Sequence, residues 1–333
     1  MNISESLNND LFLVDLLKPL NYEPIRAGFG KGLLKAGYLN LNVVAACADL
    51  TESTQMHLFK EQFPDRFFEI GVAEQNLVTV GSGLAAVNKI PFVSSYAAFS
   101  PGRNWEQIRT TICLNDRPVK IVGSHAGVSV GPDGATHQML EDIALMRVLP
   151  NMKVFAPADS IEAEKITLAM VLDNKPNYLR LAREKTPIIT TEKTPFRIGQ
   201  GYVLSKGSDI SIFATGTMTA QALLASELLY KKGIDAEVVH LPTIKPLDLQ
   251  TIIESVKKTK IGLTVEEAQV NGGFGSAVAE VIAENYPVKL KRLGIYDRFG
   301  ESGSPDQLIK FFQLDSQGIF EQVINFLGQH KHK

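Results

Sequence analysis

Short, almost uninterrupted apolar runs alternate along this chain with segments of helical pattern, and no other feature constrains the fold as strongly. A strand that is apolar on both faces belongs inside a sheet that helices cover on both sides. Strands of this kind that alternate with helices predict a parallel, doubly covered sheet. The first series of runs lies at residues 41–50, 66–71, 90–99, 118–127, 152–159 and 176–183.

A second series of apolar runs follows a segment that is rich in Thr and Pro and poor in large apolar residues. Well-marked helical segments separate these runs, and one of them, TAQALLASELLYKKG, ends at Gly233. We therefore expect two α/β domains, at residues 18–188 and 198–330, joined by a linker at 189–197. Each domain is predicted to hold a mainly parallel sheet with helices on both faces. The second series of runs lies at residues 209–216, 235–241, 260–268 and 288–295.

Length, charge and cysteine placement narrow the class of protein. The chain has 333 residues and a formal net charge of −2, so it has room for two domains and no basic field that would attract nucleic acid or an anionic membrane. Asp15 interrupts the apolar stretch near the N-terminus, and no basic region precedes it, so neither a secretory signal nor a membrane span is expected. Cys47 and Cys113 lie in apolar runs and read as buried, reduced thiols, as in cytoplasmic proteins.

One carboxylate, Glu74, stands out in the stretch DRFFEIGVAEQN at residues 65–76. The stretch runs from a β-forming segment through Gly71, where the chain can turn, into a helix that begins near Ala73. Glu74 is thus expected in the first helical turn, just beyond the carboxyl end of a strand, where open parallel sheets bind their ligands. A glutamate at such a place often only complements the helix dipole, so its position alone assigns no catalytic role.

Other polar and aromatic side chains follow the strands of the first series at the same predicted edge of the sheet. Each has an ordinary structural interpretation: a core aromatic, a tight turn at GPDG, or a solvated strand end. His125 and His137 are twelve positions apart, unlike the closely spaced pair of a helical metal site, so no metal site is expected in this chain. Taken singly, the structural interpretations are favoured. The side chains are Asp49, Ser53, Glu74, Tyr96, Phe99, His125, Asp159 and Arg183.

Three separated motifs, in the same order, resemble the C-terminal half of transketolases. They are DRFFEIGVAEQNLVTVGSGLA, GVSVGPDGATHQMLEDIALMRVLPNMKVFAPAD and PTIKPLD…TVEEAQVNGGFGSAVAE. The resemblance runs from about Glu23 to about Leu308 and so covers both predicted domains. It implies that the first domain is similar to the pyrimidine-binding domain of a thiamine-diphosphate enzyme, and the second to the transketolase C-terminal domain.

The resemblance gives Glu74 a chemical role. In this family a carboxylic acid, hydrogen-bonded to ring nitrogen N1′ of thiamine diphosphate, promotes loss of the proton at C2 of that cofactor, and Glu74 matches the acid. The cofactor supplies the chemistry, while the protein supplies position and electrostatics. To donate a hydrogen bond, Glu74 must be held in its protonated form, and we expect burial among apolar residues such as Val72 to favour that form.

Aromatic and imidazole side chains receive roles from the same resemblance. Tyr96 and Phe99 match aromatic residues that stack on the pyrimidine ring of the cofactor. His125 and His137 match catalytic histidines that hydrogen-bond the sugar hydroxyls and the developing alkoxide, and imidazole suits proton movement near neutral pH. Asp133 matches a carboxylate that contacts a substrate hydroxyl.

Three further residues, Arg26, Ser53 and Arg183, match positions that bind the phosphate of the sugar. The planar fork and permanent charge of arginine suit that anion. Sugar phosphates are therefore the implied substrates. Pentose-phosphate intermediates, branched sugars and sulfonated sugars would present similar hydroxyls to the histidines, so the resemblance leaves the individual sugar open.

A full-length transketolase carries, before the resembling region, a domain that binds the diphosphate through Mg²⁺ or Ca²⁺ with a Gly-Asp-Gly motif. This chain lacks that motif. GPDG at 131–134 lies in GVSVGPDGATHQ, which resembles the loop that contacts the substrate in this family, and GGFGSA at 272–277 lacks the Lys-Ser/Thr of a P-loop. We therefore expect the C-terminal subunit of a split transketolase, which moves a two-carbon ketol unit from a ketose phosphate to an aldose phosphate. An N-terminal subunit would bind the diphosphate and the metal within an α2β2 heterotetramer. Packing and assembly are the expected tasks of the second domain.

Three alternatives stay open beside this expectation. The beta subunit of a 2-oxo-acid dehydrogenase has similar domains and an equivalent glutamate, but GPDGATHQ and LMRVLPNM fit the sugar-transferring branch better. A deoxyxylulose-phosphate synthase shares GVAEQN and THQ. A non-catalytic paralogue is disfavoured, because a structural relic need not keep Glu74, His125, His137 and Arg183.

Overall fold

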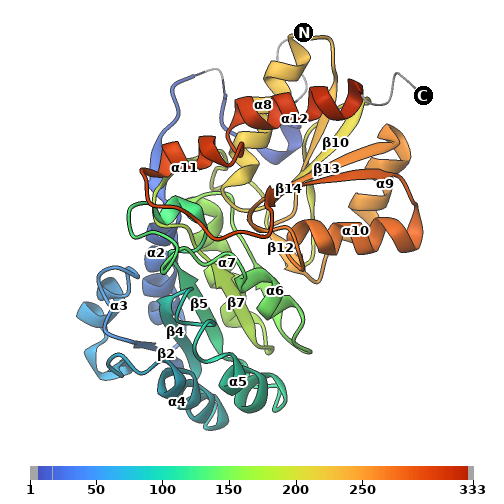
Figure 1. Ribbon diagram of the computed structural model, residues 1–333. Coiled ribbons are helices and arrows are strands. Elements are labelled where there is room, and N and C mark those ends of the chain that lie inside the picture. Colours follow the sequence, from blue (N-terminus) through green and yellow to red (C-terminus); the bar gives the residue numbers. More distant parts are fainter. Residues whose placement is uncertain (1–6, 17, 329–333) are drawn as a thin grey trace.

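The computed structural model describes residues 7–16 and 18–328 and contains two large sheets, each covered by helices (Figure 1). This arrangement confirms the predicted α/β class with two domains. Every apolar run of the first series forms a strand of a seven-stranded sheet in the order β12-β6-β7-β5-β4-β2-β3, and six of these strands are parallel. Their bounds are β2 (Val43–Cys47), β3 (Phe67–Glu69), β4 (Ile90–Tyr96), β5 (Lys120–Ser124), β6 (Lys153–Phe155), β7 (Asn177–Arg180) and the antiparallel β12 (Thr243–Lys245).

The second series of runs forms four strands of a five-stranded sheet in the order β14-β13-β10-β11-β9, and β9 is a further strand that no predicted run includes. Four of its strands are parallel, and β9 is antiparallel to β11. A separate antiparallel pair joins β1 (Tyr22–Pro24) to β8 (Lys185–Pro187). The strands of the five-stranded sheet are β9 (Tyr202–Ser205), β10 (Ile210–Ala214), β11 (Ala236–His240), β13 (Ile261–Gln269) and β14 (Lys289–Ile295).

Strand β12 corrects the expectation that each sheet is built from one domain alone. It lies after β11 in the sequence, within the predicted second domain, yet it pairs with β6 of the first sheet, with Thr243 opposite Phe155. A three-residue strand carries too little sequence pattern to be predicted, because its pairing depends on how the two domains pack. The first sheet therefore ends in a strand that the second domain supplies.

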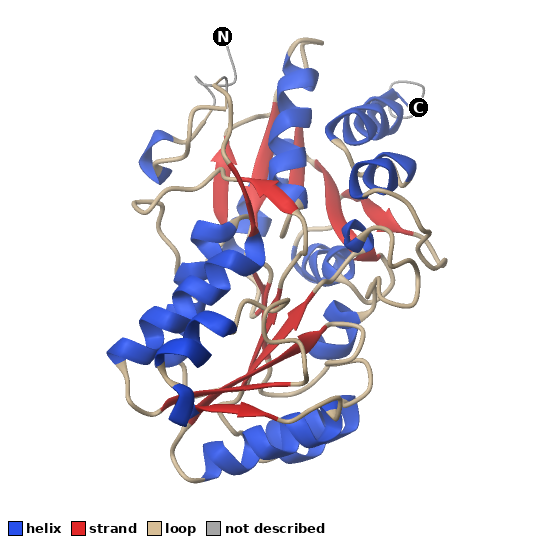
Figure 2. Ribbon diagram, turned by 90° about the vertical axis from the view of Figure 1, so that its left-hand side faces the viewer, coloured by secondary structure: helices blue, strands red, loops and turns tan. Residues whose placement is uncertain are grey.

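Helices cover both faces of each sheet, as Figure 2 shows. On the first sheet, α2, α3 and α7 pack on one face and α4 and α6 on the other, because successive strand residues point to opposite faces. On the second sheet, α8 and α12 pack on one face and α9 and α10 on the other. The helices are α2 (Ile25–Leu39), α3 (His57–Gln62), α4 (Glu74–Ala86), α5 (Trp105–Gln107), α6 (Asp142–Arg147), α7 (Ser160–Leu172), α8 (Met218–Tyr230), α9 (Leu249–Thr259), α10 (Phe274–Asn285), α11 (Pro305–Phe311) and α12 (Ser316–Gly328). Shorter helical turns lie at Asn9–Leu11, Pro64–Arg66, Ile108–Cys113 and Val128–Val130.

One apolar core runs without interruption from the first domain into the second. Val154 and Tyr178 of the first sheet belong to the same buried cluster as Phe213, Val239 and Phe274 of the second domain, and all five are at most 1% exposed. Burial of this kind is the main favourable term in folding. The two domains are thus joined by packed side chains as well as by the chain itself.

The N-terminal segment packs on the second domain rather than on the first. Leu11 and Leu16 lie in the core of the second domain, and the amide of Asn8 donates to the carbonyl of Leu204 at 2.9 Å. No helix within residues 7–16 and 18–328 is long and apolar enough to cross a membrane. Cys47 and Cys113 are both buried and unpaired, as predicted.

Candidate active site

Glu74 is the first residue of α4 and lies just beyond the carboxyl end of β3, as predicted. Its side chain is 4% exposed, although Val72, which we expected to bury it, is 69% exposed. That expectation was wrong, and the cover comes from the segment that follows β4. There Asn104 donates its side-chain amide to the backbone carbonyl of Glu74 at 2.8 Å. The carboxylate therefore lies against a turn that sequence patterns did not single out.

Arg103, on the same turn, is the side-chain partner of Glu74. Its Nη1 lies 3.3 Å from each carboxylate oxygen, and its guanidinium lies over the ring of Phe99, 4.2 Å from the ring centroid. A planar, nitrogen-bearing group thus lies against both the carboxylate and the aromatic ring. Arg103 itself is 53% exposed. We missed this residue because it lies four positions beyond Phe99 in a turn, not at the end of a strand.

The structure gathers the predicted aromatic and imidazole side chains into one cluster. Tyr96 stacks on His125 with ring centroids 3.8 Å apart, and Phe99 contacts His137 edge-on at 5.4 Å. Tyr96 and Phe99 are themselves nearly parallel at 6.1 Å. These residues come from the ends of β4 and β5 and from the loop at 125–138, which we call the substrate loop. The carboxyl ends of parallel strands meet at one edge, so the strand order produces this cluster.

His125 is 2% exposed and has a positive φ of 59°, a backbone conformation that few side chains adopt. Its Nδ1 shares a hydrogen bond with the hydroxyl of Ser124 at 2.8 Å. Burial and, to a smaller extent, the nearby cations of Arg26 and Arg183 together lower the pKa of His125 to about 3. With this pKa the His125 ring is neutral near pH 7, and its expected part in proton movement stays a prediction. His125 can still exchange hydrogen bonds with a hydroxyl or an oxyanion.

Arg26, Ser53 and Arg183 lie together, as predicted for the anion end of the site. Arg26 donates from Nε to the carbonyl of Arg183 at 3.2 Å and from Nη1 to the carbonyl of Ser53 at 2.5 Å. Burial lowers the pKa of Arg26, and the neighbouring charge of Arg183 adds to that effect. Two guanidinium groups held this close repel each other, so an anion bound at this place would be stabilised.

Asp133 lies 3.5 Å from the guanidinium of Arg183, so its carboxylate faces a cation. The same guanidinium donates to the carbonyl of Val130 at 2.8 Å and lies 3.5 Å from Glu184. Arg183 thus ties the substrate loop to the first domain at two points. The predicted contact between Asp133 and a substrate hydroxyl would require the carboxylate to share Arg183 with the substrate.

Asp159 follows β6 at the same edge but serves the fold. One oxygen accepts the amide of Glu162 at 2.9 Å and caps α7, and the other accepts the amides of Ile189 at 2.9 Å and Thr190 at 2.7 Å. A fully buried carboxylate whose oxygens are satisfied in this way has no capacity left for a ligand. We therefore remove it from the candidate site.

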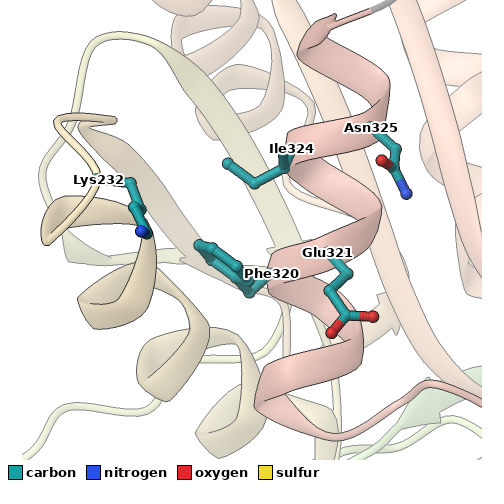
Figure 3. A pocket seen from close by; sticks show the side chains of 5 residues that line it. All are labelled: Lys232, Phe320, Glu321, Ile324 and Asn325. Carbon is teal, nitrogen blue, oxygen red and sulfur yellow. The ribbon is translucent and has the colours of Figure 1, made fainter.

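A cavity of about 540 Å³ lies elsewhere, between α8 and α12 (Figure 3). Phe320 and Ile324 point from α12 toward the end of the helix that carries Lys232. Glu321 and Asn325 complete its lining, and none of the predicted site residues belongs to it. The candidate site is therefore the edge of the first sheet and not this cavity.

Comparison with known proteins identifies both domains. Residues 24–188 match the family described as transketolase, pyrimidine binding domain, and residues 199–319 match transketolase, C-terminal domain. A protein of Methanocaldococcus jannaschii that is named as a transketolase C-terminal section is 45% identical over 307 residues, which cover 91% of this chain and 96% of that protein. A 6-deoxy-6-sulfo-D-fructose transketolase subunit of a Clostridium species is 39% identical and covers 86% of this chain and 89% of its own length.

Solved structures and longer relatives agree with these matches. A structure described as a split-gene transketolase in an inactive beta4 tetramer has a TM-score of 0.85 and 43% identity, and the match covers 91% of this chain and 97% of that one. Human transketolase is 35% identical, but the match spans only 48% of its length. A deoxyxylulose-phosphate synthase of Syntrophus aciditrophicus is 38% identical over 46% of its length. The chain thus spans about half the length of these longer relatives.

Proposed function

This chain belongs to the transketolase family of transferases, and we propose that it is the C-terminal subunit of a split transketolase. The reaction would transfer a two-carbon ketol unit from a ketose phosphate to an aldose phosphate. One observation carries the proposal: the guanidinium of Arg103 lies against both the carboxylate of Glu74 and the ring of Phe99. A planar ring with nitrogen donors and acceptors along one edge could occupy the same place beside Glu74 and Phe99.

The aminopyrimidine ring of thiamine diphosphate is such a ring and would take the place of the guanidinium. When bound, this cofactor supplies the nucleophilic carbon that accepts the two-carbon unit. Glu74 would hold a proton toward the pyrimidine nitrogen, Phe99 would lie against the ring, and Arg103 would have to move aside. Tyr96 already stacks on His125, so we assign it the support of that histidine as well as contact with the ring.

The substrate would extend from the cofactor along the edge of the sheet. His125, neutral because its pKa is about 3, would hydrogen-bond a sugar oxygen without competing for a proton. His137, whose ring lies edge-on to Phe99, would contact neighbouring hydroxyls. Arg26 and Arg183 would bind the phosphate, with Ser53 and Asp133 at the sides of that anion.

The remaining half of the cofactor site belongs, in this proposal, to an N-terminal subunit that binds the diphosphate through Mg²⁺ or Ca²⁺. The related split-gene structure is described as an inactive tetramer of beta chains, which supports the need for a second kind of chain. An α2β2 heterotetramer, located in the cytoplasm and acting on pentose-phosphate intermediates, is the full form of the proposal. The sulfosugar enzyme among the relatives makes a sulfonated ketose a second donor to test.

The test compares the purified chain alone with the chain mixed with the N-terminal subunit of the same organism, in the presence of thiamine diphosphate and Mg²⁺. We expect ketol transfer only from the mixture, and a complex with the mass of two copies of each subunit by analytical ultracentrifugation. Robust transfer by the chain alone would overturn the split arrangement. Oxidative acyl transfer from a 2-oxo acid to a lipoyl group, or condensation of pyruvate with glyceraldehyde phosphate, would favour the two related alternatives instead.

A further inference from the structure

We propose that Glu267, on β13 of the second domain, is a positioning residue that fixes the substrate loop for the reaction. This inference rests on the proposed function, because the loop is the segment that carries His125, Asp133 and His137. It also changes the expected task of the second domain, which would be more than packing and assembly.

Each oxygen of the Glu267 carboxylate accepts a hydrogen bond. Glu267 is 2% exposed, and its Oε1 accepts the backbone amide of Ser129, in the first half of the loop, at 2.5 Å. Its Oε2 accepts the hydroxyl of Thr217, at the start of α8, at 2.9 Å. Arg180 of the first sheet donates to the backbone carbonyl of Glu267 at 2.8 Å. A buried carboxylate that receives an amide from the loop and is itself fixed from both domains can hold that amide in one place.

The loop is shaped to accept this carboxylate at Gly127. This residue has a φ of +89°, and a Cβ added there would lie 2.3 Å from Oε1 of Glu267. Only glycine combines that backbone conformation with so close an approach. The two domains therefore meet in a specific contact, which consists of Gly127, the carboxylate of Glu267 and the amide of Ser129.

Other parts of the second domain hold the far end of the loop. The side-chain amide of Gln138 donates to the carbonyls of Glu301 at 2.8 Å and Gly131 at 3.0 Å, and a Cβ at Gly300 would lie 1.7 Å from its oxygen. The amide of Gln269 donates to the carbonyl of Leu140 at 2.9 Å. The first domain contributes mainly Arg183, as described above. Removal of Glu267 should therefore free the loop around Ser129, while the contacts of Arg183 and Gln138 remain.

The experiment measures amide hydrogen exchange of residues 126–138 by mass spectrometry in the full chain, free and in complex with the N-terminal subunit. Glu267→Ala should exchange at least about tenfold faster in this segment than the wild type. Glu267→Gln should stay near the wild type, because its amide oxygen can still accept the Ser129 amide. Glu237→Ala serves as the matched control: Glu237 is a buried carboxylate of the second domain that pairs with Lys258 and does not contact the loop.

Steady-state kinetics in the reconstituted complex add a second measurement. Glu267→Ala should lower kcat/KM by at least about tenfold, mainly by raising KM for the sugar. Cofactor affinity should be unchanged, since Glu74 and Phe99 lie outside the loop, and Glu267→Gln should restore most of the loss. Thr217→Val, which removes only the second hydrogen bond to the carboxylate, should show the same changes to a smaller degree.

Unchanged exchange in Glu267→Ala would refute the proposal, and so would equal acceleration in the Glu237→Ala control. If Glu267→Ala fails to fold, Thr217→Val decides by the same measurements: faster exchange in residues 126–138 supports the proposal, and unchanged exchange refutes it. Hydrogen exchange can be measured without turnover. A complex that transfers no ketol group would refute the proposed function, and the exchange rates would still test the role of Glu267.

Discussion

Each of the two sheets has a buried histidine at the carboxyl end of one strand, but the two histidines have different hydrogen-bond partners. His125 follows β5 in the first sheet and His240 ends β11 in the second, and both are 2% exposed. Both ring nitrogens of His240 are hydrogen-bonded, to the hydroxyl of Thr219 and to the carboxylate of Glu162, each at 2.8 Å. The hydrogen bond described for His125 involves Nδ1 only, and its ring otherwise contacts Tyr96.

The carboxylates of the two edges differ in the same way. Glu74 is matched by one half-exposed cation at 3.3 Å, whereas Glu267 receives a backbone amide and a hydroxyl from within the fold. Side chains whose hydrogen bonds are completed internally hold the structure, and those left with a replaceable partner can meet a ligand. Changes at the first edge should therefore alter activity with little effect on stability. Changes between the domains should alter stability.

Glu74→Gln should cause the largest effect, a loss of kcat of about 10²- to 10⁴-fold in the reconstituted complex, because an amide cannot share a proton as a carboxylic acid does. The free energy of unfolding should change by less than about 1 kcal/mol, since the ion pair with Arg103 is half exposed. Chemical denaturation and initial rates measure the two quantities. The control is Glu106→Gln, an exposed glutamate nearby, and activity within tenfold of the wild type would remove Glu74 from its assigned role.

Asp142→Ala should lower the free energy of unfolding by about 3 to 5 kcal/mol, because it leaves a buried cation without a partner. Asp142 is fully buried and accepts from Arg180 at 3.0 Å and from the hydroxyl of Tyr178 at 2.8 Å. The matched control is Asp116→Asn, which removes the charge of the partly exposed pair with Lys175 and should cost about 1 kcal/mol or less. Equal losses in urea denaturation would contradict the contrast between the buried and exposed pairs.

His125 should make stability depend on pH. Its pKa falls from 6.5 to about 3 on folding, so between these values the unfolded chain binds a proton that the folded chain does not. Its contribution to stability is complete above pH 6.5 and is lost as the pH falls toward 3. Between about pH 7.5 and about pH 5, wild-type protein should lose about 2 kcal/mol more than His125→Asn. Denaturation curves of both proteins at both pH values test this. Equal losses of stability in the wild type and in His125→Asn would show that a different group causes the pH dependence.

Arg103→Gln should have the smallest effect, a two- to fivefold tighter binding of thiamine diphosphate, estimated from the value of about 1 kcal/mol or less for an exposed ion pair. In the wild type, the guanidinium of Arg103 must move away from Glu74 before the pyrimidine ring of the cofactor can bind there. The neutral side chain of glutamine competes less with that ring for Glu74. Fluorescence titration of the complex measures the dissociation constant, with Arg109→Gln as the control. Weaker binding in Arg103→Gln would instead make Arg103 a cofactor ligand.

Much of the fold could be predicted because its strands are apolar on both faces. The short strands β9 and β12 could not, since their pairing depends on contacts between distant segments. The edge of the first sheet was predictable because parallel strands end together, and that rule also wrongly suggested Asp159, whose oxygens serve the fold. The roles of Arg103 and Glu267 depend on a turn and on domain packing, which no local pattern records. The domain limits 18–188 and 198–330, the linker 189–197 and the individual site assignments stay predictions, and residues 329 and 330 lie outside the described residues.

The apolar cluster shared by both domains has a consequence for how this protein can be divided. A fragment that stops at the linker would leave the partners of Phe213 and Phe274 open to water, and such surfaces aggregate. Heating should therefore melt the whole chain in one calorimetric transition instead of two. The boundary between the two domains is therefore an unsuitable place at which to divide this polypeptide.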